Sequence, residues 1–255
     1  MADAVLADFR DDGTTVITIN RPETRNAVNR DVAVAVAEAL DELDRRDDQV
    51  VGVITGAGNT FCSGMDLKAF LAGERPVVEG RGFAGITEAP PRKPVIAAVE
   101  GHALAGGCEI VLACDMVVAA DDARFGIPEV KRGLVAAAGG LLRLPRRIPY
   151  VVAMEIALTG DLLDAGRAHA YGLVNRLTAP GGALAGALEL AGAIAANGPL
   201  AVRATKQVLA EAPAWPAEEE WQRMRALTGP VFASEDAKEG PRAFAEKRRP
   251  RWTGR

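Results

Sequence analysis

Hydrophobic residues in the first half of the chain fall into short β-branched runs separated by glycine-rich or polar segments. This pattern predicts an N-terminal β-hairpin, one helix and three further buried strands. These elements are expected at residues 4–10 and 14–20, 31–46, and 50–55, 95–99 and 116–120. Asn29 can cap the helix with its side-chain oxygen, and Asp31 near its start suits the positive end of the helix dipole.

A strand, a glycine-rich loop and a short helix follow one another several times up to about residue 195. The loop Gly56–Gly64 precedes a short helix at Met65–Leu71, and Gly101–Gly107 precedes another at Cys108–Ala113. Parallel strands need such crossovers, so the pattern indicates an α/β fold with right-handed winding. Residues 73–92 contain too many Gly, Pro and charged residues for a packed element and predict a surface loop or lid.

The pattern changes near Pro199, where strand signals stop and helical ones begin. A break is expected at Gly229-Pro230. Three helical stretches are predicted at Leu200–Ala210, Ala217–Leu227 and Ser234–Arg248. Because helices without strands cannot extend a sheet, we expect a core at residues 1–195 and a C-terminal helical region at 196–255 that forms a lid or an oligomer contact.

Composition and charge exclude several classes of protein. The chain is 49% hydrophobic and 25% charged, as ordinary globular proteins are. Its net charge of −4 and pI of about 5.4 argue against nucleic acid as the main partner. Met1–Arg10 lacks a signal-peptide pattern, and no apolar run reaches membrane-spanning length. We therefore expect a cytoplasmic protein with no membrane partner.

Cysteine and histidine offer little for metal or nucleophilic chemistry. Cys62, Cys108 and Cys114 show no metal-binding spacing and stand among apolar or small neighbours, which predicts buried free thiols. The only histidines are His102 and His169. We expect no metal site.

Two segments place glycine directly before a helix. They are Phe61–Lys68 and Gly101–Glu109. Small residues at such a turn let a ligand approach the backbone, and a helix N-terminus offers unpaired N–H groups. Two such groups that converge on one point would bind a developing oxyanion, such as a thioester enolate.

Two glutamates stand in apolar surroundings, Glu109 after the second turn and Glu129 after Pro128. Burial raises the pKa of a carboxyl group, which suits proton transfer near neutral pH. Taken singly, each is equally explained as a buried carboxylate held by backbone or by an arginine such as Arg132 or Arg143.

Together these segments resemble the crotonase superfamily, and within it the enoyl-CoA hydratases. The shared landmarks keep their order and spacing over essentially the whole chain. They are Asn20-Arg21-Pro22, Asn26-Ala27, Lys93-Pro94, Gly106–Glu109, Cys114-Asp115, Phe125–Glu129, Gly139-Gly140, Gly172–Asn175 and the tail Phe244–Trp252. The resemblance implies a spiral of ββα repeats with a C-terminal helical trimerisation region that also covers the active site, in a homotrimer or a hexamer built as a dimer of trimers.

The resemblance also implies a reaction, the reversible syn addition of water across the 2,3 double bond of a trans-2-enoyl-CoA in fatty acid metabolism. The oxyanion hole would consist of the backbone N–H groups of Met65 and Gly106. Glu109 would activate water at C3 and Glu129 would serve C2. This lyase needs no cofactor, because CoA is part of the substrate.

CoA contacts are expected near the first turn and from basic side chains. Lys247 would reach the CoA of a neighbouring subunit. The candidates are Arg25, Cys62, Ser63, Asp66, Leu67, Lys68 and Lys247. Each basic one is equally explained as a solvated surface charge.

Several departures leave the acyl group open. Ala105 stands where the family usually has a third glycine, and residues 133–140 replace a Gly-x-x-Pro-Gly stretch that lines the acyl pocket in relatives. The run Leu142–Pro145 resembles carnitinyl-CoA dehydratases, which is the alternative activity within the family. Isomerases commonly use one glutamate and dehalogenases an aspartate, so two glutamates favour hydration.

Other classes fit less well. A non-catalytic acyl-CoA binding protein would not need both glutamates. A serine hydrolase could use Ser63 and His102, but Ser63 lies in no Gly-x-Ser-x-Gly pattern. A dinucleotide-binding domain would need a third glycine after Gly56 and Gly58, and Asn59-Thr60-Phe61 follows instead.

Overall fold

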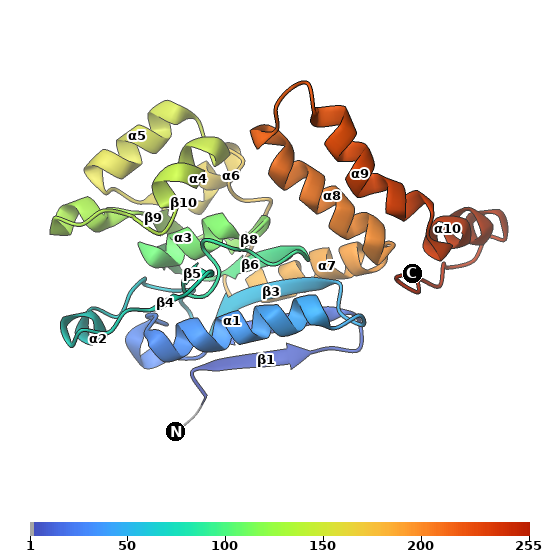
Figure 1. The fold of residues 1–255 in the computed structure, drawn as a ribbon. Coiled ribbons are helices and arrows are strands. Elements are labelled where there is room, and N and C mark those ends of the chain that lie inside the picture. Colours follow the sequence, from blue (N-terminus) through green and yellow to red (C-terminus); the bar gives the residue numbers. More distant parts are fainter. Residues whose placement is uncertain (1–2) are drawn as a thin grey trace.

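A six-stranded sheet forms the centre of the computed structural model, which describes residues 3–255 (Figure 1). The strand order is β1-β2-β3-β6-β8-β11, with β1 and β2 antiparallel and all later neighbours parallel. The strands are β1 (Val5–Phe9), β2 (Thr14–Ile19), β3 (Val51–Gly56), β6 (Val95–Val99), β8 (Met116–Ala120) and β11 (Arg176–Thr178). The α/β class expected from the sequence is confirmed.

A second layer of short strands follows the long ones. It contains β7 (His102–Leu104), β9 (Arg124–Gly126) and β10 (Leu163–Asp164), and Cys62 pairs with Ala103 at its edge. After each of β3, β6 and β8 the chain therefore turns into a short extended piece before the next helix or turn. This repeated step is the ββα winding that the resemblance implied.

The helices cover both sides of the sheet (Figure 1). They are α1 (Arg30–Arg45), α2 (Leu67–Leu71), α3 (Gly106–Ala113), α4 (Gly140–Arg147), α5 (Tyr150–Thr159), α6 (Ala165–Ala170), α7 (Ala183–Ala195), α8 (Pro199–Glu211), α9 (Glu220–Phe232) and α10 (Glu235–Ala245). Short 3-10 turns η1 (Pro22–Thr24), η2 (Pro128–Arg132) and η3 (Ala212–Ala214) and a small hairpin of β4 (Val77–Val78) and β5 (Gly82–Phe83) complete the fold. The Asn29 side chain accepts the Val32 N–H and so caps α1 as expected.

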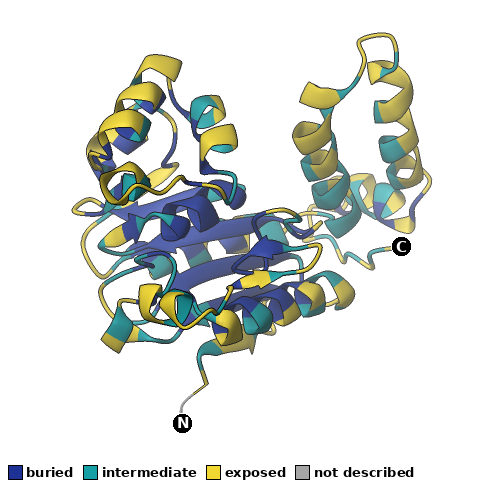
Figure 2. Ribbon diagram, turned by 60° about the vertical axis from the view of Figure 1, so that its left-hand side comes forward, coloured by how far each residue is buried: buried dark blue, intermediate teal, exposed yellow. Residues whose placement is uncertain are grey.

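The inner strands of the sheet and α3 are the most buried parts of the molecule, whereas the edge strands β1 and β11 and the outer helices are partly exposed (Figure 2). All eight residues of α3 are buried. Cys62, Cys108 and Cys114 are buried free thiols, which confirms the prediction. Their burial raises the pKa of each thiol to about 12, so all three stay protonated at neutral pH.

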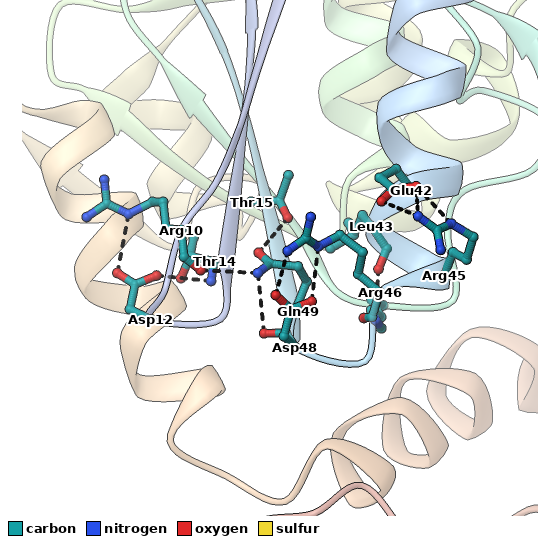
Figure 3. A network of polar contacts seen from close by, with 11 residues as sticks. Arg10, Asp12, Thr14, Thr15, Glu42, Leu43, Arg45, Arg46, Asp48 and Gln49 are labelled. Carbon is teal, nitrogen blue, oxygen red and sulfur yellow. Dashed lines mark hydrogen bonds and ion pairs between the residues drawn. The ribbon is translucent and has the colours of Figure 1, made fainter.

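A polar cluster joins the end of α1 to the first hairpin (Figure 3). The buried Gln49 accepts a hydrogen bond from the Thr15 hydroxyl at 2.9 Å and donates to the Arg10 carbonyl at 3.1 Å. Its amide therefore finds partners inside the protein, as a buried polar group must. These contacts fix the α1–β3 connection against the turn between β1 and β2.

Two expectations were wrong in part. Residues 73–92 do not form only a surface loop, because Phe83 and Ile86 are buried in the core. Gly82 and Gly85, at φ +77° and +69°, bend the chain so that these side chains turn inward. The break at Gly229-Pro230 is absent, since both lie inside α9. Pro230 is the third residue from the end of α9, so the hydrogen bond that it removes and the crowding by its ring fall in the last turn and do not divide the helix.

The helices α8, α9 and α10 extend to one side of the sheet, beyond α7 (Figure 1). A cavity of about 1080 Å³ lies between α8 and α9 and the ends of α3 and α4. Lys206 of α8 connects the two sides, donating to the carbonyls of Pro91 and Lys93 at 2.8 and 2.9 Å and to the Asp115 carboxylate at 2.7 Å.

No single helix in residues 3–255 is long and apolar enough to cross a membrane. The consecutive helices Ala183–Ala195 and Pro199–Ala214 pass that test of length and composition only as a pair, and they are bent by 109°.

Replacing Lys206 with methionine should loosen α8 from the core. The substitution removes the cation paired with Asp115, whose carboxylate keeps only the Val95 N–H, and it removes the Lys206 donor from two carbonyls. These losses should lower the free energy of unfolding by about 2 kcal/mol. Chemical denaturation measures this. Lys238→Met, which removes an exposed ion pair to Glu235, is the control and should change stability by less than about 0.5 kcal/mol. Equal effects of the two substitutions would show that Lys206 does not hold α8 to the core.

Candidate active site

A pocket of about 590 Å³ brings together residues from both glycine turns and both glutamates. Several residues expected from the sequence to act in the site line it. They are Arg25, Ser63, Met65, Leu67, Gly106, Glu109 and Glu129. The remaining wall is mostly apolar. Its apolar side chains include Phe70, Val77, Phe83, Leu104, Pro128, Leu134 and Val135.

The two turns lie directly against each other. The Leu104 N–H donates to the Cys62 carbonyl at 3.0 Å. A Cβ built on Gly107 would lie 2.2 Å from that carbonyl oxygen, and one on Gly64 would lie 3.1 Å from the Gly106 nitrogen. Only glycine permits these approaches, so the glycines bring the segments around Met65 and Gly106 together.

Two backbone N–H groups are available at this contact. Val28 donates to Gly64 O at 2.8 Å and accepts from Asp66 N at 2.9 Å, so the Met65 N–H faces away from that bridge. Gly106 is the first residue of α3, and its N–H has no partner within the helix. Two donors of this kind in an apolar pocket can stabilise an oxyanion.

Glu109 lies in the first turn of α3 and is only 3% exposed. Its Oε1 accepts the Gly140 N–H at 2.9 Å. Burial raises the pKa of this carboxyl from 4.5 to about 7, and the negative charge of Glu129 adds to the rise. The N–H groups of Gly140 and Ala138 and the Arg143 guanidinium act in the opposite direction. Glu109 therefore exchanges its proton near neutral pH.

Glu129 follows Pro128 at the start of η2. Its Oε2 is buried and has no hydrogen-bond partner among the described residues. Burial raises the pKa of this carboxyl too, opposed by its own backbone N–H and by Arg132. The pocket therefore holds two carboxyl groups with raised pKa values, and the charge of Glu129 is one of the causes of the raised pKa of Glu109.

The predicted CoA contacts separate into two groups. Arg25, Ser63 and Leu67 line the pocket. The Cys62 thiol is buried, and Asp66 caps α2 and pairs with Arg21 at 3.0 Å. The second group consists of four residues that do not line the described pocket. They are Cys62, Asp66, Lys68 and Lys247. Their part in CoA binding stays a prediction.

Within one chain, no described residue after Ala138 lines the pocket. The prediction that the C-terminal region covers the site therefore requires a neighbouring subunit. The serine hydrolase alternative finds no geometric support, because the Ser63 hydroxyl donates to the Thr24 carbonyl at 3.4 Å and His102 is not among the lining residues.

Sequence reasoning missed two contributors to the site. The Gly140 N–H holds Glu109, although Gly139-Gly140 was noted only as a landmark. Phe83 packs against Gly106, where an added Cβ would come within 2.5 Å of its ring. Its position was hidden because residues 73–92 were assigned to a surface loop. The available signal was Phe83 followed by Ile86, two large apolar residues close together in a stretch rich in glycine and charge.

Known proteins resemble the chain over its whole length. Residues 10–255 match the family model described as enoyl-CoA hydratase/isomerase. Enoyl-CoA hydratase EchA19 of Mycobacterium tuberculosis is 43% identical over 95% of this chain and 94% of its own. Carnitinyl-CoA dehydratase of Salmonella typhi is 42% identical, with 94% of each chain covered.

Solved structures agree with these relatives. The crystal structure of enoyl-CoA hydratase EchA1 from Mycobacterium marinum is 59% identical with a TM-score of 0.97, covering 99% of this chain and 100% of that one. A carnitinyl-CoA hydratase from Mycobacterium avium is 44% identical with a TM-score of 0.79, with 100% of both chains covered.

Alanine at position 105 should make the protein less stable than glycine would. It has φ 51° and ψ −127°, a conformation that glycine adopts readily and alanine does not. Ala105→Gly should therefore raise the free energy of unfolding by about 1 kcal/mol, measured by denaturation. Ala103→Gly in the neighbouring strand β7 is the control and should lower it. Loss of stability in both variants would refute strain at Ala105.

Glu109→Gln should stabilise the protein in alkaline but not in acidic solution. The native pKa of about 7 exceeds the ordinary value of 4.5, so the unfolded chain releases this proton first. Stability from Glu109 is thus complete below pH 4.5 and is lost as the pH rises to about 7. At pH 8 the variant should gain up to about 3 kcal/mol over wild type. Thermal unfolding from pH 4.5 to 8 measures this, and a difference independent of pH would refute it.

Proposed function

The chain belongs to the enoyl-CoA hydratase/isomerase family, and on this premise we propose that it is a hydro-lyase that reversibly hydrates a trans-2-enoyl-CoA thioester. One observation supports this most strongly. Two glutamates with raised pKa values and two backbone donors line a single, mostly apolar pocket. Hydration of a conjugated thioester needs a base, an acid and an oxyanion site, and this chain supplies all three from its own groups.

In the proposed mechanism the thioester carbonyl oxygen accepts the N–H groups of Met65 and Gly106. Ionised Glu109 takes a proton from the water that attacks C3, and negative charge moves onto the carbonyl oxygen as an enolate. Protonated Glu129 then delivers a proton to C2, and dehydration reverses these roles. Positioned acid–base groups typically contribute ~10²–10⁴-fold in rate, and one oxyanion donor ~10²–10³-fold.

A carnitinyl-CoA dehydratase activity is the alternative. Relatives with that name cover 94% of this chain at 42% identity. The pocket is also lined by Glu88, outside the catalytic pair. A carboxylate there can attract the trimethylammonium group of a carnitinyl or crotonobetainyl thioester, which a plain enoyl chain lacks.

We also propose that the protein works in the cytoplasm as a homotrimer or hexamer, with Lys247 reaching a neighbour's CoA. Large apolar side chains on α8–α10 and at the ends of these helices are exposed in the single chain. They are Leu209, Trp221, Phe232 and Phe244. Apolar surface of this extent favours burial against another copy.

The loss of enoyl absorbance with crotonyl-CoA tests the proposal. Wild type should hydrate it, and Glu109→Gln and Glu129→Gln should each lose at least ~10²-fold in kcat while KM changes little. The exposed Glu38 on α1 provides the control, and Glu38→Gln should keep full activity. Turnover that survives both pocket substitutions would show that the catalytic residues are wrongly assigned.

The same assay with crotonobetainyl-CoA separates the two activities. If wild type strongly prefers this substrate and Glu88→Gln raises its KM without changing KM for crotonyl-CoA, the carnitinyl alternative is correct. A preference for uncharged enoyl-CoA supports the hydratase.

A further inference from the structure

Arg143 lies behind the catalytic pocket. It is on the first turn of α4, half-buried, and lines the large cavity beside the C-terminal helices. It is not among the residues that line the active-site pocket. From this position its guanidinium cannot contact the substrate, so any effect on the reaction passes through a neighbour.

The guanidinium packs on the turn that holds Glu109. A Cβ built on Gly139 would lie 2.2 Å from Arg143 Nη1. The next residue, Gly140, donates its N–H to Glu109 Oε1 at 2.9 Å. Arg143 thus packs against Gly139, the residue directly before the donor to Glu109.

Arg143 also ties this turn to the segment that forms the other wall. Its Nη2 donates to the Thr87 carbonyl at 2.5 Å. The Thr87 N–H in turn donates to the Phe83 carbonyl at 3.3 Å, and the Phe83 ring packs against Gly106. Arg143 therefore contacts both the turn that holds Glu109 and the segment whose Phe83 ring packs against Gly106.

The charges that act on Glu109 come from two elements. Glu129 on η2 disfavours its ionised form, and Arg143 on α4 favours it. Cys108, its neighbour on α3, is neutral because burial raises the pKa of that thiol to about 12. Arg132 acts on Glu129 instead. Arg143 is the cation with the largest effect on the pKa of Glu109 among the described residues.

We propose that Arg143 is a positioning residue for the hydration: it holds the Gly139-Gly140 turn against Glu109 and supplies the positive charge that keeps this glutamate available as a base. The inference rests on the proposed function for its kinetic consequence, but the link between Arg143 and Glu109 holds for any reaction in the pocket.

The kinetic test compares Arg143→Gln, which retains a donor for Thr87 but loses the charge, with Arg143→Lys, which retains the charge. The dependence of kcat/KM for crotonyl-CoA is measured from pH 5 to 9. In Arg143→Gln the acidic limb should move upward by about 1 pH unit, which makes the loss at pH 6 about tenfold larger than at pH 9. Arg143→Lys should restore most of the wild-type profile.

Arg146 provides the matched control. It lies on the same helix and lines the same cavity, but it is not among the groups with the largest effects on the pKa of Glu109. Arg146→Gln should therefore leave the pH profile in place. An equal displacement in Arg146→Gln, or an activity loss in Arg143→Gln that is the same at every pH, would overturn the proposal and leave Arg143 a purely structural role.

A second readout does not depend on activity. The ¹³C carboxyl signals of labelled glutamate are followed with pH, and the Glu109 signal is assigned from its absence in Glu109→Gln. Its titration midpoint should rise by about 1 pH unit in Arg143→Gln. An unchanged midpoint would refute the proposal, whereas a shifted midpoint in a protein that hydrates no enoyl-CoA would uphold the link and refute the proposed function.

Discussion

The close approach of two backbone turns, one ending at Met65 and the other at Gly106, is the constraint on which the rest of the structure depends. The approach needs Gly64 and Gly107, because a Cβ at either position would collide with the facing backbone. It aligns two N–H groups on one point, and it starts α3 at that point. Because α3 then runs into the core with every residue buried, its first turn carries Glu109 into a place that water hardly reaches.

The burial of Glu109 has an energetic cost that the surrounding structure only partly offsets. Desolvation dominates its pKa, and the Gly140 N–H and the Arg143 charge recover a part of the loss. A fully compensated carboxylate would titrate well below neutral pH and would be a poor acid in the reverse direction. Incomplete compensation raises the pKa of Glu109 to about 7, so the destabilising contribution of this residue and the role proposed for it in proton transfer have one origin.

Local patterns in the sequence were sufficient for five of the six strands of the sheet. They did not reveal β11, which is only three residues long and mostly exposed. The resemblance to a family, rather than any local pattern, joined the two glutamates to the two turns. β6 and β8 have the predicted bounds, because an uninterrupted apolar run such as Val95–Val99 can be recognised as a buried strand from the sequence alone. The contacts that hold the site were not predictable in this way. Gly140 lies 31 residues from Glu109, and nothing in the intervening sequence indicates the hydrogen bond between them. Phe83 was missed because it stands among glycines, in a stretch rich in Gly, Pro and charged residues. Helix α9 was cut short because Pro230 is usually a helix breaker.

The chemistry and the acyl wall of the pocket occupy different kinds of structure. Glu109 and the two turns are built into the core, whereas Leu134 and Val135 lie in an exposed stretch between η2 and α4. Substitutions in an exposed stretch cost little stability, and those in a core are seldom tolerated. Under the proposed function, selection can therefore exchange the residues proposed to meet the acyl chain while leaving the groups proposed for proton transfer unchanged. Evolution of substrate range in this protein is, on these grounds, uncoupled from evolution of its reaction.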